Sequence, residues 1–228
     1  MSGALPAARP WTIAHRAANH PAALREALAA GVDLVEGDLW LYGGRLEVRH
    51  LKTLGPVPVL WDRWRLVLRR SWRLELLEIL AAMRPEACLL LDLKGTDRRL
   101  PAALAEALAA YSGSVAVCSR NWALLEPFRR REGMTVLYSA GNGRELRRLP
   151  DRLAGPGGPG VSVHRRLLTP DVVRALRERA SAVVTWPVST YAQARRLTAW
   201  GVDGLISDNL ALLRALTRER DGTARREP

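Results

Sequence analysis

The sequence predicts an α/β protein that folds as one (β/α)8 barrel, a TIM barrel, with a much reduced insertion after the second strand. Three observations support this prediction. Short apolar, β-branched runs alternate eight times with segments whose apolar residues recur at three- and four-residue spacing. The 228 residues fit the usual length of such a barrel, about 250 residues. Polar residues follow the predicted strands, where barrels of this kind carry their active sites.

Each predicted strand is a short apolar run, and each predicted helix follows a strand along the chain. The strands span Trp11 to His15, Leu34 to Trp40, Ala87 to Lys94, Ser114 to Ser119, Thr135 to Ser139, Gly160 to His164, Ala182 to Trp186 and Gly204 to Ser207. The helices span Pro21 to Ala30, Leu74 to Met83, Pro101 to Ala110, Trp122 to Arg131, Gly143 to Leu153, Pro170 to Arg179, Thr190 to Ala199 and Leu210 to Arg218.

Several helix ends carry residues suited to that position. Thr169 supplies a capping hydroxyl before a proline at the first helical position and an acid in the first turn. Ser189 and Asn209 are placed to cap the seventh and eighth helices in the same way. Gly31 and Gly201 are placed to end the first and seventh helices.

Four segments depart from the alternation of strands and helices. Residues 42–49 indicate a hairpin extension with a Gly-Gly turn, and residues 51–72 indicate an irregular stretch rich in Trp, Arg and Pro, which forms the reduced insertion. Residues 155–160, rich in Gly and Pro, link the fifth helix to the sixth strand. We expect residues 1–220 to form a single domain and residues 221–228 to form a disordered tail.

The composition is that of a globular protein, with 48% apolar and 25% charged residues. No stretch approaches the roughly 18 apolar residues that a membrane span needs, and the first residues lack the pattern of a secretory signal. We therefore expect a cytoplasmic protein. Cys88 and Cys118 lie in apolar runs, which predicts buried free thiols in a reducing compartment rather than a disulfide framework.

The net charge of +12 is compatible with nucleic acid, a membrane surface or an anionic small molecule as a partner. Most of the basic residues are arginines on predicted helices, without the interleaved aromatic residues of a nucleic-acid groove, so we expect no nucleic-acid partner. Of the 35 basic residues only Lys52 and Lys94 are lysines. Lys94 ends a predicted strand, which indicates a place where a compact ammonium is required.

Acidic residues end two neighbouring predicted strands. Glu36 and Asp38 are two residues apart, so their side chains leave the same face of the strand, and Asp92 and Lys94 repeat this spacing on the next strand. Three carboxylates in a small volume repel one another unless a cation is bound. Because the ligand atoms are all oxygens, the pattern predicts a hard divalent ion, Mg²⁺ or Ca²⁺.

Basic residues and histidines complete this predicted site. Arg16 and Lys94 are placed to bind the oxygens of a phosphate group, and His15 and His50 to carry protons to and from it. His164 ends the sixth strand, where it would contact the leaving group. The pattern therefore predicts a metal-dependent site for a phosphate group.

At these residues the sequence resembles the glycerophosphodiester phosphodiesterase family, of the phosphatidylinositol-phospholipase-C-like superfamily. The similar segments are Ile13-Ala14-His15-Arg16, Val35-Glu36-Gly37-Asp38, Leu46-Glu47-Val48-Arg49-His50, Val184-Thr185-Trp186-Pro187-Val188 and Trp200-Gly201-Val202-Asp203-Gly204-Leu205-Ile206-Ser207-Asp208. They span nearly the whole chain. The resemblance implies hydrolysis of a glycerophosphodiester to glycerol 3-phosphate and an alcohol.

The resemblance also implies a role for each matching residue. The implied roles are acid/base catalysis by His15 and His50, metal binding by Glu36, Asp38 and Asp92, phosphate contact by Arg16 and Lys94, and a pocket wall beside the glycerol formed by Trp186. Asp92 stands where the family usually has glutamate. Residues 19–22 replace the family's Pro-Glu-Asn-Thr turn and its acid, and Leu51 replaces an aspartate after the second histidine.

These departures keep two alternatives open. The first is a lysophospholipase D-like phosphodiesterase that meets anionic lipid through the Trp- and Arg-rich insertion, whose candidate residues are Trp61, Arg63, Trp64, Arg65, Arg69 and Arg70. The second is a catalytically impaired barrel that binds a phosphorylated ligand or a lipid surface without turnover.

Overall fold

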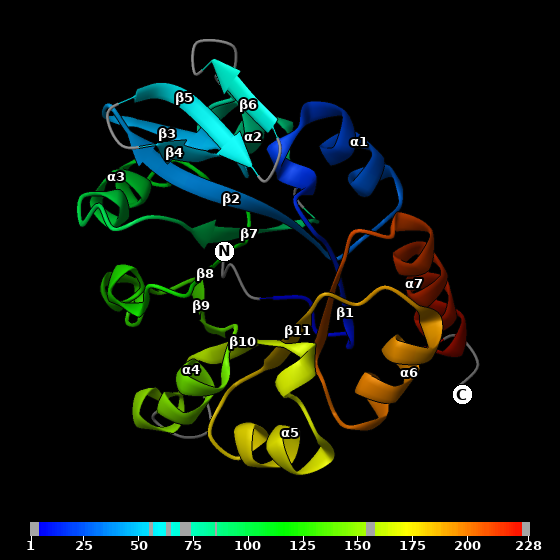
Figure 1. Cartoon of the computed structure of the whole chain (residues 1–228). Helices are drawn as coiled ribbons and strands as arrows, with labels where there is room; N and C mark the ends of the chain where they lie inside the picture. The colour runs from blue at the N-terminus through cyan, green and yellow to red at the C-terminus, as the bar shows by residue number, and fades with distance from the viewer. Residues whose placement is uncertain are drawn as a thin grey trace.

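The computed structural model describes residues 5–54, 57–62, 65–68, 74–84, 86–153 and 158–224 (Figure 1). Within these residues eight parallel strands form a closed barrel, because the last strand, β12, pairs with β1, and β1 also pairs with β2. In barrel order the strands are β1 (Trp11–Ala14), β2 (Leu34–Tyr42), β7 (Cys88–Leu93), β8 (Val115–Ser119), β9 (Met134–Ala140), β10 (Gly160–His164), β11 (Val183–Trp186) and β12 (Gly204–Ser207). Each of the eight predicted strands coincides with one of them, so the predicted barrel is confirmed.

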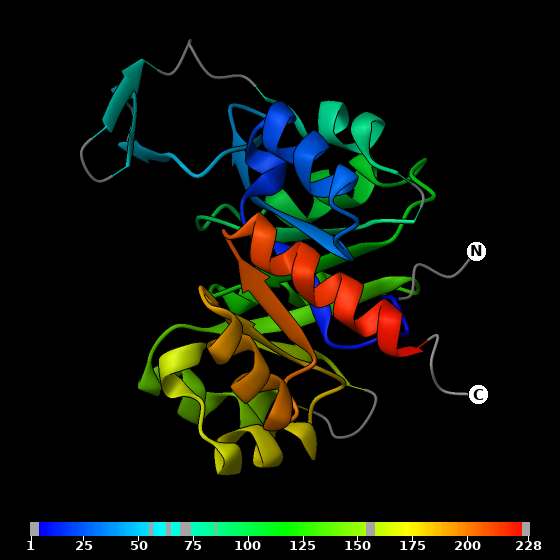
Figure 2. The ribbon, with the colours of Figure 1, turned by 90° about the vertical axis from the view of Figure 1, so that its right-hand side faces the viewer.

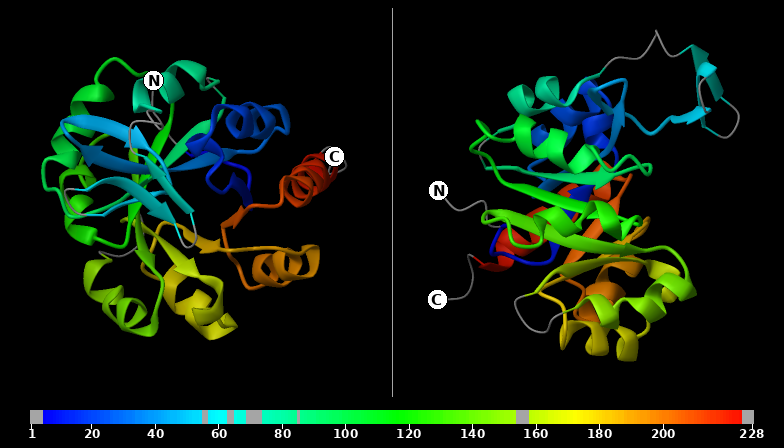
Figure 3. Two further views of the ribbon diagram at one scale, coloured as in Figure 1. Left: turned by 45° about the horizontal axis from the view of Figure 1, so that its top comes forward. Right: turned by 90° about the vertical axis from the view of Figure 1, so that its left-hand side faces the viewer.

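Helices surround the barrel on its outer side (Figure 3). They are α1 (Pro21–Ala29), α2 (Leu76–Ala82), α3 (Leu100–Ala107), α4 (Gly143–Arg148), α5 (Pro170–Arg177), α6 (Tyr191–Ala199) and α7 (Leu210–Ala224). Short 3₁₀ helices cover Ala17–Asn19, Trp122–Leu124, Glu126–Phe128, Pro150–Arg152 and Arg165–Leu167. The helix predicted over Trp122 to Arg131 is therefore wrong in type. Pro127 lies in its middle, and it lacks the N–H that an α-helix needs there.

Most of the predicted helix ends agree with the structure. The hydroxyl of Thr169 accepts a hydrogen bond from the Val172 N–H, and the Asn209 side chain accepts one from the Leu212 N–H. Gly31 and Gly201 have φ of 71° and 93°, as expected for residues that end helices. The capping residue of α6 is Thr190, so the prediction of Ser189 was wrong by one residue.

Two helix ends differ from the prediction by five residues or more. The helix predicted to reach Leu153 stops at Arg148, because Pro150 follows and a 3₁₀ turn replaces the α-helix there. The last helix, α7, continues to Ala224, so the first four residues of the predicted tail are helical. Residues 225–228, and residues 155–157 of the predicted Gly- and Pro-rich loop, lie outside the described part of the chain.

The reduced insertion is more ordered than the composition predicts. The predicted hairpin is present, formed by β2 and the antiparallel β3 (Arg45–Val48). The stretch predicted to be irregular contains a second antiparallel sheet of β4 (Lys52–Leu54), β5 (Val57–Asp62) and β6 (Arg65–Leu68). Its short runs rich in Val and Leu favour strands, and this preference outweighs their Trp, Arg and Pro content. Figure 2 shows this sheet standing clear of the barrel.

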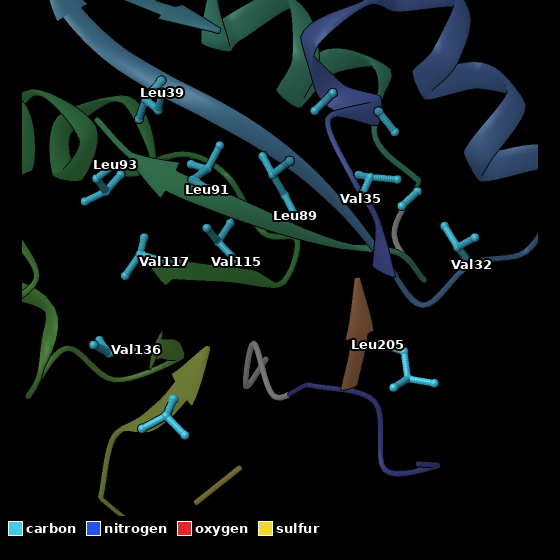
Figure 4. Close-up of a cluster of buried hydrophobic side chains, with 14 of the residues drawn as sticks. Val32, Val35, Leu39, Leu89, Leu91, Leu93, Val115, Val117, Val136 and Leu205 are labelled. Carbon is cyan, nitrogen blue, oxygen red and sulfur yellow. The ribbon is translucent and has the colours of Figure 1, made fainter. Parts of the chain in front are cut away.

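Successive residues of each barrel strand pack on opposite sides of the strand. Leu89 and Leu91 of β7 belong to the cluster between the strands and the helices, together with Val115 and Val117 of β8 (Figure 4). Leu90 belongs to a second cluster inside the barrel. The inner cluster forms a closed apolar floor, so polar groups on inward-facing positions can meet only above it. Of the described helices, none is long and apolar enough to cross a membrane.

Both cysteines lie in the interior as free thiols, Cys88 and Cys118. Burial raises the pKa of Cys88 to about 12 and the pKa of Cys118 well above its usual value. Because the thiolate is the reactive form, we expect neither thiol to react with Ellman's reagent in the folded protein at about pH 8. Both should react once urea unfolds the chain. A native thiol that reacts as fast as free cysteine would contradict this prediction.

Candidate active site

A cavity of about 680 Å³ lies at the C-terminal ends of the barrel strands. All nine residues that the sequence analysis assigns to the site line this cavity, and they are His15, Arg16, Glu36, Asp38, His50, Asp92, Lys94, His164 and Trp186. The structure therefore brings together groups that lie up to 171 residues apart in the chain.

The alternation of side chains along the strands explains why these residues meet. On β2, Leu34 belongs to the apolar floor, and Glu36 and Asp38 follow at two-residue steps on the same inner face. On β7, Leu90 belongs to the floor and Asp92 follows it. Asp38 and Asp92 are register partners on these two neighbouring strands, so their carboxylates rise side by side.

The three carboxylates form a compact cluster. One oxygen from each of Glu36, Asp38 and Asp92 lies within 4.8 Å of the other two. Burial, and then the charge of Asp38, raise the pKa of Glu36 to about 7. Burial also raises the pKa of Asp92. Burial acts in the same direction on Asp38, but hydrogen bonds from His50 and Lys94 hold the pKa of Asp38 well below its usual value.

A hard divalent cation fits this cluster. Every candidate ligand atom is a carboxylate oxygen, and burial and the charge of Asp38 raise the pKa of Glu36 to about 7, so a bound cation would favour the ionised form of Glu36. Lys94 is the ammonium in contact with the cluster: its Nζ lies 2.8 Å from Asp38 Oδ1 and also donates to Asp92. Three carboxylates against one ammonium leave an excess of negative charge, which a divalent ion would neutralise.

Both lysines of the chain line the same cavity. Lys94 was predicted to have a special role because the chain otherwise uses arginine, and the structure shows that Lys52 lines the cavity as well. The field of Asp92, Asp38 and Glu36 outweighs burial and raises the pKa of Lys94, so this ammonium stays charged. Arg120 at the end of β8 is a further cation of the cavity, although Glu145 pairs with its guanidinium at 2.6 Å.

His15 is held by an aspartate that the sequence analysis quoted but gave no role. Its Nδ1 lies 2.8 Å from Asp208 Oδ1, and its Nε2 lies 4.0 Å from Glu36 Oε2. The hydrogen bond with His15 lowers the pKa of Asp208, so Asp208 is ionised and can only accept. Nδ1 must therefore carry the proton, which leaves Nε2 for proton exchange. Burial opposes the charged ring, but Asp208 and Glu36 together raise the pKa of His15.

His50 is oriented in the same manner by another carboxylate. Its Nδ1 lies 3.1 Å from Asp38 Oδ2. Because Asp38 is ionised, Nδ1 of His50 is the donor in this hydrogen bond. The two imidazoles therefore each use one nitrogen for orientation, as in sites where a carboxylate fixes the tautomer of a catalytic histidine.

The backbone around His50 is fixed by an ion pair that the sequence analysis missed. Arg49 is 0% exposed; its Nε donates to Glu47 Oε2 at 2.8 Å, and its Nη1 donates to the Leu51 carbonyl. Its guanidinium also lies 5.0 Å from the centre of the Trp40 ring, and the Trp40 indole N–H donates to the Arg49 carbonyl. Carbonyl groups on both sides of His50 are thus held in place. The two-residue spacing of Glu47 and Arg49 on a strand is a signal that could have revealed this pair.

Asn19 is a second positioning residue that the sequence analysis gave no role. Its Nδ2 donates to Asp38 Oδ2 at 2.7 Å, and its Oδ1 accepts from the Asp38 N–H at 2.8 Å. The 3₁₀ helix Ala17–Asn19 approaches β2 closely at Gly37. An added Cβ on this glycine would lie only 2.8 Å from the Cβ of Ala18. The loop that lacks the family's acid therefore contributes an amide, which orients a carboxylate instead of supplying one.

Arg16 has an unusual backbone conformation, with φ 55° and ψ 14°. This conformation directs its N–H to Glu36 Oε2 at 2.6 Å, while its guanidinium Nε lies 4.0 Å from Asp38 Oδ2. Backbone and side chain of Arg16 thus both face the carboxylate cluster. A left-handed non-glycine residue costs about 1–2 kcal/mol, and such strain is found at functional sites.

Replacing Arg16 should reveal this strain. Both Arg16→Ala and Arg16→Gly remove the guanidinium, but only glycine adopts the left-handed conformation without a Cβ clash. We expect R16G to be more stable than R16A by about 1 kcal/mol, measured by urea unfolding. We expect both variants to bind inorganic phosphate equally weakly. An R16A protein as stable as R16G would show that the conformation is not strained.

His164 and Trp186 form a wall of the cavity. They are register partners on β10 and β11, and their rings meet edge to face at 4.9 Å and 88°. Burial, with the charges of Arg166 and Arg165, lowers the pKa of His164. The ring is therefore predominantly neutral at neutral pH, and it lies apart from the two histidines that carboxylates orient. Contact of this wall with substrate stays a prediction.

The chain matches a known protein family. The model of the "Glycerophosphoryl diester phosphodiesterase family" matches residues 52–212, more than half of the chain. No curated protein matches the chain significantly. The residues before position 52, which include His15, Glu36, Asp38 and His50, lie outside the family match.

Solved structures show the same fold. A phosphodiesterase of Oleispira antarctica, in complex with the product sn-glycerol-3-phosphate, has a TM-score of 0.73 at 19% identity, covering 93% of this chain and 97% of that one. A glycerophosphodiester phosphodiesterase of Parabacteroides distasonis has a TM-score of 0.72 at 19% identity, with 94% and 99% covered. That of Thermotoga maritima has a TM-score of 0.70 at 20% identity, with 90% and 97% covered.

Proposed function

The chain belongs to the glycerophosphoryl diester phosphodiesterase family, a family of hydrolases, and from this premise we propose that it hydrolyses a glycerophosphodiester to glycerol 3-phosphate and an alcohol. One arrangement carries the proposal: three carboxylates, two carboxylate-oriented imidazoles and two cations, Arg16 and Lys94, line one cavity. The product complex of the Oleispira antarctica phosphodiesterase supports the same substrate class.

We propose that Glu36, Asp38 and Asp92 hold one divalent cation, Mg²⁺ or Ca²⁺. When bound, such an ion neutralises charge on the phosphoryl oxygens and makes phosphorus more electrophilic. Asn19 and the Arg16 N–H hold two of the three carboxylates in place before any ion arrives. This preorganisation reduces the cost of gathering like charges.

The two histidines supply the proton transfers. One imidazole Nε2 accepts the proton of the neighbouring glycerol hydroxyl as its oxygen attacks phosphorus, and the other donates a proton to the departing alcohol oxygen. Water then opens the cyclic phosphate and releases glycerol 3-phosphate. Asp208 stabilises the charged form of the His15 ring, and Asp38 orients the ring of His50. Lys94 and Arg16 donate to the nonbridging oxygens.

Substrate turnover is the direct test. The pure protein is incubated with glycerophosphocholine, glycerophosphoethanolamine and lysophosphatidylcholine, with and without EDTA, and glycerol 3-phosphate and the free base are assayed. We expect release of glycerol 3-phosphate from at least one water-soluble diester, and loss of that activity in EDTA. Tight phosphate binding without turnover of any diester would assign the protein as a binding barrel instead.

Metal binding can be measured apart from turnover. We expect isothermal titration of the metal-free protein with MgCl₂ or CaCl₂ to show one site, with affinity at least about tenfold lower in Asp92→Asn. Glu106→Gln is a matched control, because Glu106 lies on α3 and outside the cavity lining. Equal affinities in the wild-type and D92N proteins would contradict the proposed metal ligands.

A further inference from the structure

One face of the β4–β6 sheet is apolar and open to solvent. In the register of this sheet Val59 pairs with Leu68, and Trp61 pairs with Leu66, so these four side chains share a face. Leu66 is 73% exposed and Leu68 is 52% exposed. Large apolar side chains that are exposed together on one face are typical of an interaction surface.

The opposite face of the sheet is already covered. Leu60 is 0% exposed and Val67 is half-buried, and the two pair with each other across β5 and β6. The apolar side chains on this side are therefore covered, whereas the two leucines on the other side are exposed. We call the side with Val59, Trp61, Leu66 and Leu68 the open face.

The open face is continuous with the active-site cavity. Lys52 pairs with Trp61 across β4 and β5, and its Nζ lies 5.2 Å from the centre of the Trp61 ring. Lys52 also lines the cavity. An apolar path thus leads from the cavity rim through Trp61 and Leu66 to Leu68, on a sheet that stands clear of the barrel (Figures 2 and 3).

The charge around this sheet is strongly positive. Residues 51–73 contain six basic residues and one acidic residue, a net charge of +5. Arg63, Trp64, Arg69, Arg70 and Trp72 lie outside the described residues, so only their sequence contributes here. Exposed leucines together with a tryptophan and basic residues are the features of surfaces that enter the interface of an anionic lipid layer. A nucleic acid would use the positive charge but not the leucines.

We propose that the open face docks on an anionic lipid surface, so that phosphodiester headgroups enter the cavity from that surface. This inference rests on the proposed function for the headgroup chemistry. Leu66 and Leu68 insert among the acyl chains, and basic residues of the segment contact the lipid phosphates. Lys52, between the tryptophan and the cavity, directs the headgroup phosphate toward Lys94 and the carboxylate cluster.

Vesicle flotation in EDTA tests the docking without turnover. The wild-type protein is compared with Leu66→Asp/Leu68→Asp on vesicles of phosphatidylcholine mixed with phosphatidylglycerol. We expect binding of the wild type and an affinity at least about tenfold lower for the double variant. Leu77→Asp is the matched control, because Leu77 is a 61% exposed leucine on α2, and it should bind as the wild type does.

A second variant separates docking from folding. Leu66→Thr/Leu68→Thr keeps strand propensity and adds no charge, so it should keep the wild-type circular dichroism and Tm while it still loses vesicle affinity. Wild-type protein that stays off the vesicles, or an L77D loss equal to that of L66D/L68D, would overturn the proposal.

Activity on a water-soluble diester keeps the two proposals distinguishable. We expect L66D/L68D to hydrolyse glycerophosphocholine as the wild type does, because neither leucine lines the cavity. Vesicle binding without hydrolysis of any diester would contradict the proposed function but support the docking. Hydrolysis of a diester without vesicle binding would contradict the docking but support the proposed function.

Discussion

Alanine at His15 or at His50 is expected to lower kcat for glycerophosphocholine by about 10²–10⁴-fold, with a smaller change in KM. Each imidazole is oriented through Nδ1 by an ionised carboxylate, Asp208 for His15 and Asp38 for His50. Removing either ring deletes one of two proton transfers and leaves the carboxylate cluster in place. The measurement is steady-state release of glycerol 3-phosphate.

His20→Asn is the matched control for these variants. His20 caps α1 and is not among the residues that line the cavity, and asparagine is also a good capping residue. We expect H20N to keep wild-type kcat. A loss in H15A or H50A no larger than the loss in H20N would contradict the catalytic roles.

The leaving group can tell the two histidines apart. A glycerophosphodiester of p-nitrophenol releases an alcohol that is acidic enough to depart without protonation. The variant that lacks the general acid should therefore recover most of its activity on this diester, whereas the variant that lacks the base should stay slow. Equal recovery of H15A and H50A would show that the two rings do not divide the proton transfers.

Arg49→Met is expected to lower the free energy of unfolding by about 3–5 kcal/mol, measured by urea denaturation. Arg49 and Glu47 form a buried ion pair with Nε and Oε2 2.8 Å apart, and the variant leaves the glutamate charge buried beside an apolar side chain. The loss comes from the cost of keeping a buried carboxylate after its guanidinium partner is removed more than from the lost attraction. Removing both charges should therefore cost less, so Glu47→Met/Arg49→Met should recover much of the stability.

An exposed pair provides the control for this prediction. Arg99 donates to Asp97 at 2.7 Å, but its side chain is 78% exposed, so Arg99→Met should leave the free energy of unfolding almost unchanged. If R49M lost no more stability than R99M, the buried pair would not stabilise the segment around His50. We also expect R49M to lower kcat more than it raises KM, because the imidazole loses its fixed position.

Strand periodicity was enough to predict Asp92 as a site residue, although the family usually has glutamate at this position. Glu36, Asp38 and Asp92 were predicted to converge because a two-residue step keeps side chains on one face and because neighbouring parallel strands end at the same rim. The structure brings one oxygen of each within 4.8 Å of the others. The barrel itself was predictable for the same reason, since eight runs of matching periodicity admit few other arrangements.

Two predictions of secondary structure were wrong, because backbone hydrogen bonding decided the structure of these segments and their composition did not. The helix expected over Trp122 to Arg131 has the right apolar spacing, but Pro127 limits it to two 3₁₀ turns. The insertion was expected to be irregular from its Trp, Arg and Pro content, yet pairing among β4, β5 and β6 gives it a sheet.

Repeats of two residues and of three to four residues are visible in the sequence. They were sufficient to predict the barrel, the inward face of each strand and the residue types at the mouth of the barrel. The groups that hold the site in position became known only from the folded structure. Asn19 reaches Asp38, Asp208 reaches His15, and the pair of Glu47 and Arg49 closes around His50. Two of these contacts join positions 19 and 193 residues apart, and the third is local but buried, so the pattern of the chain alone does not distinguish these residues from solvated polar ones.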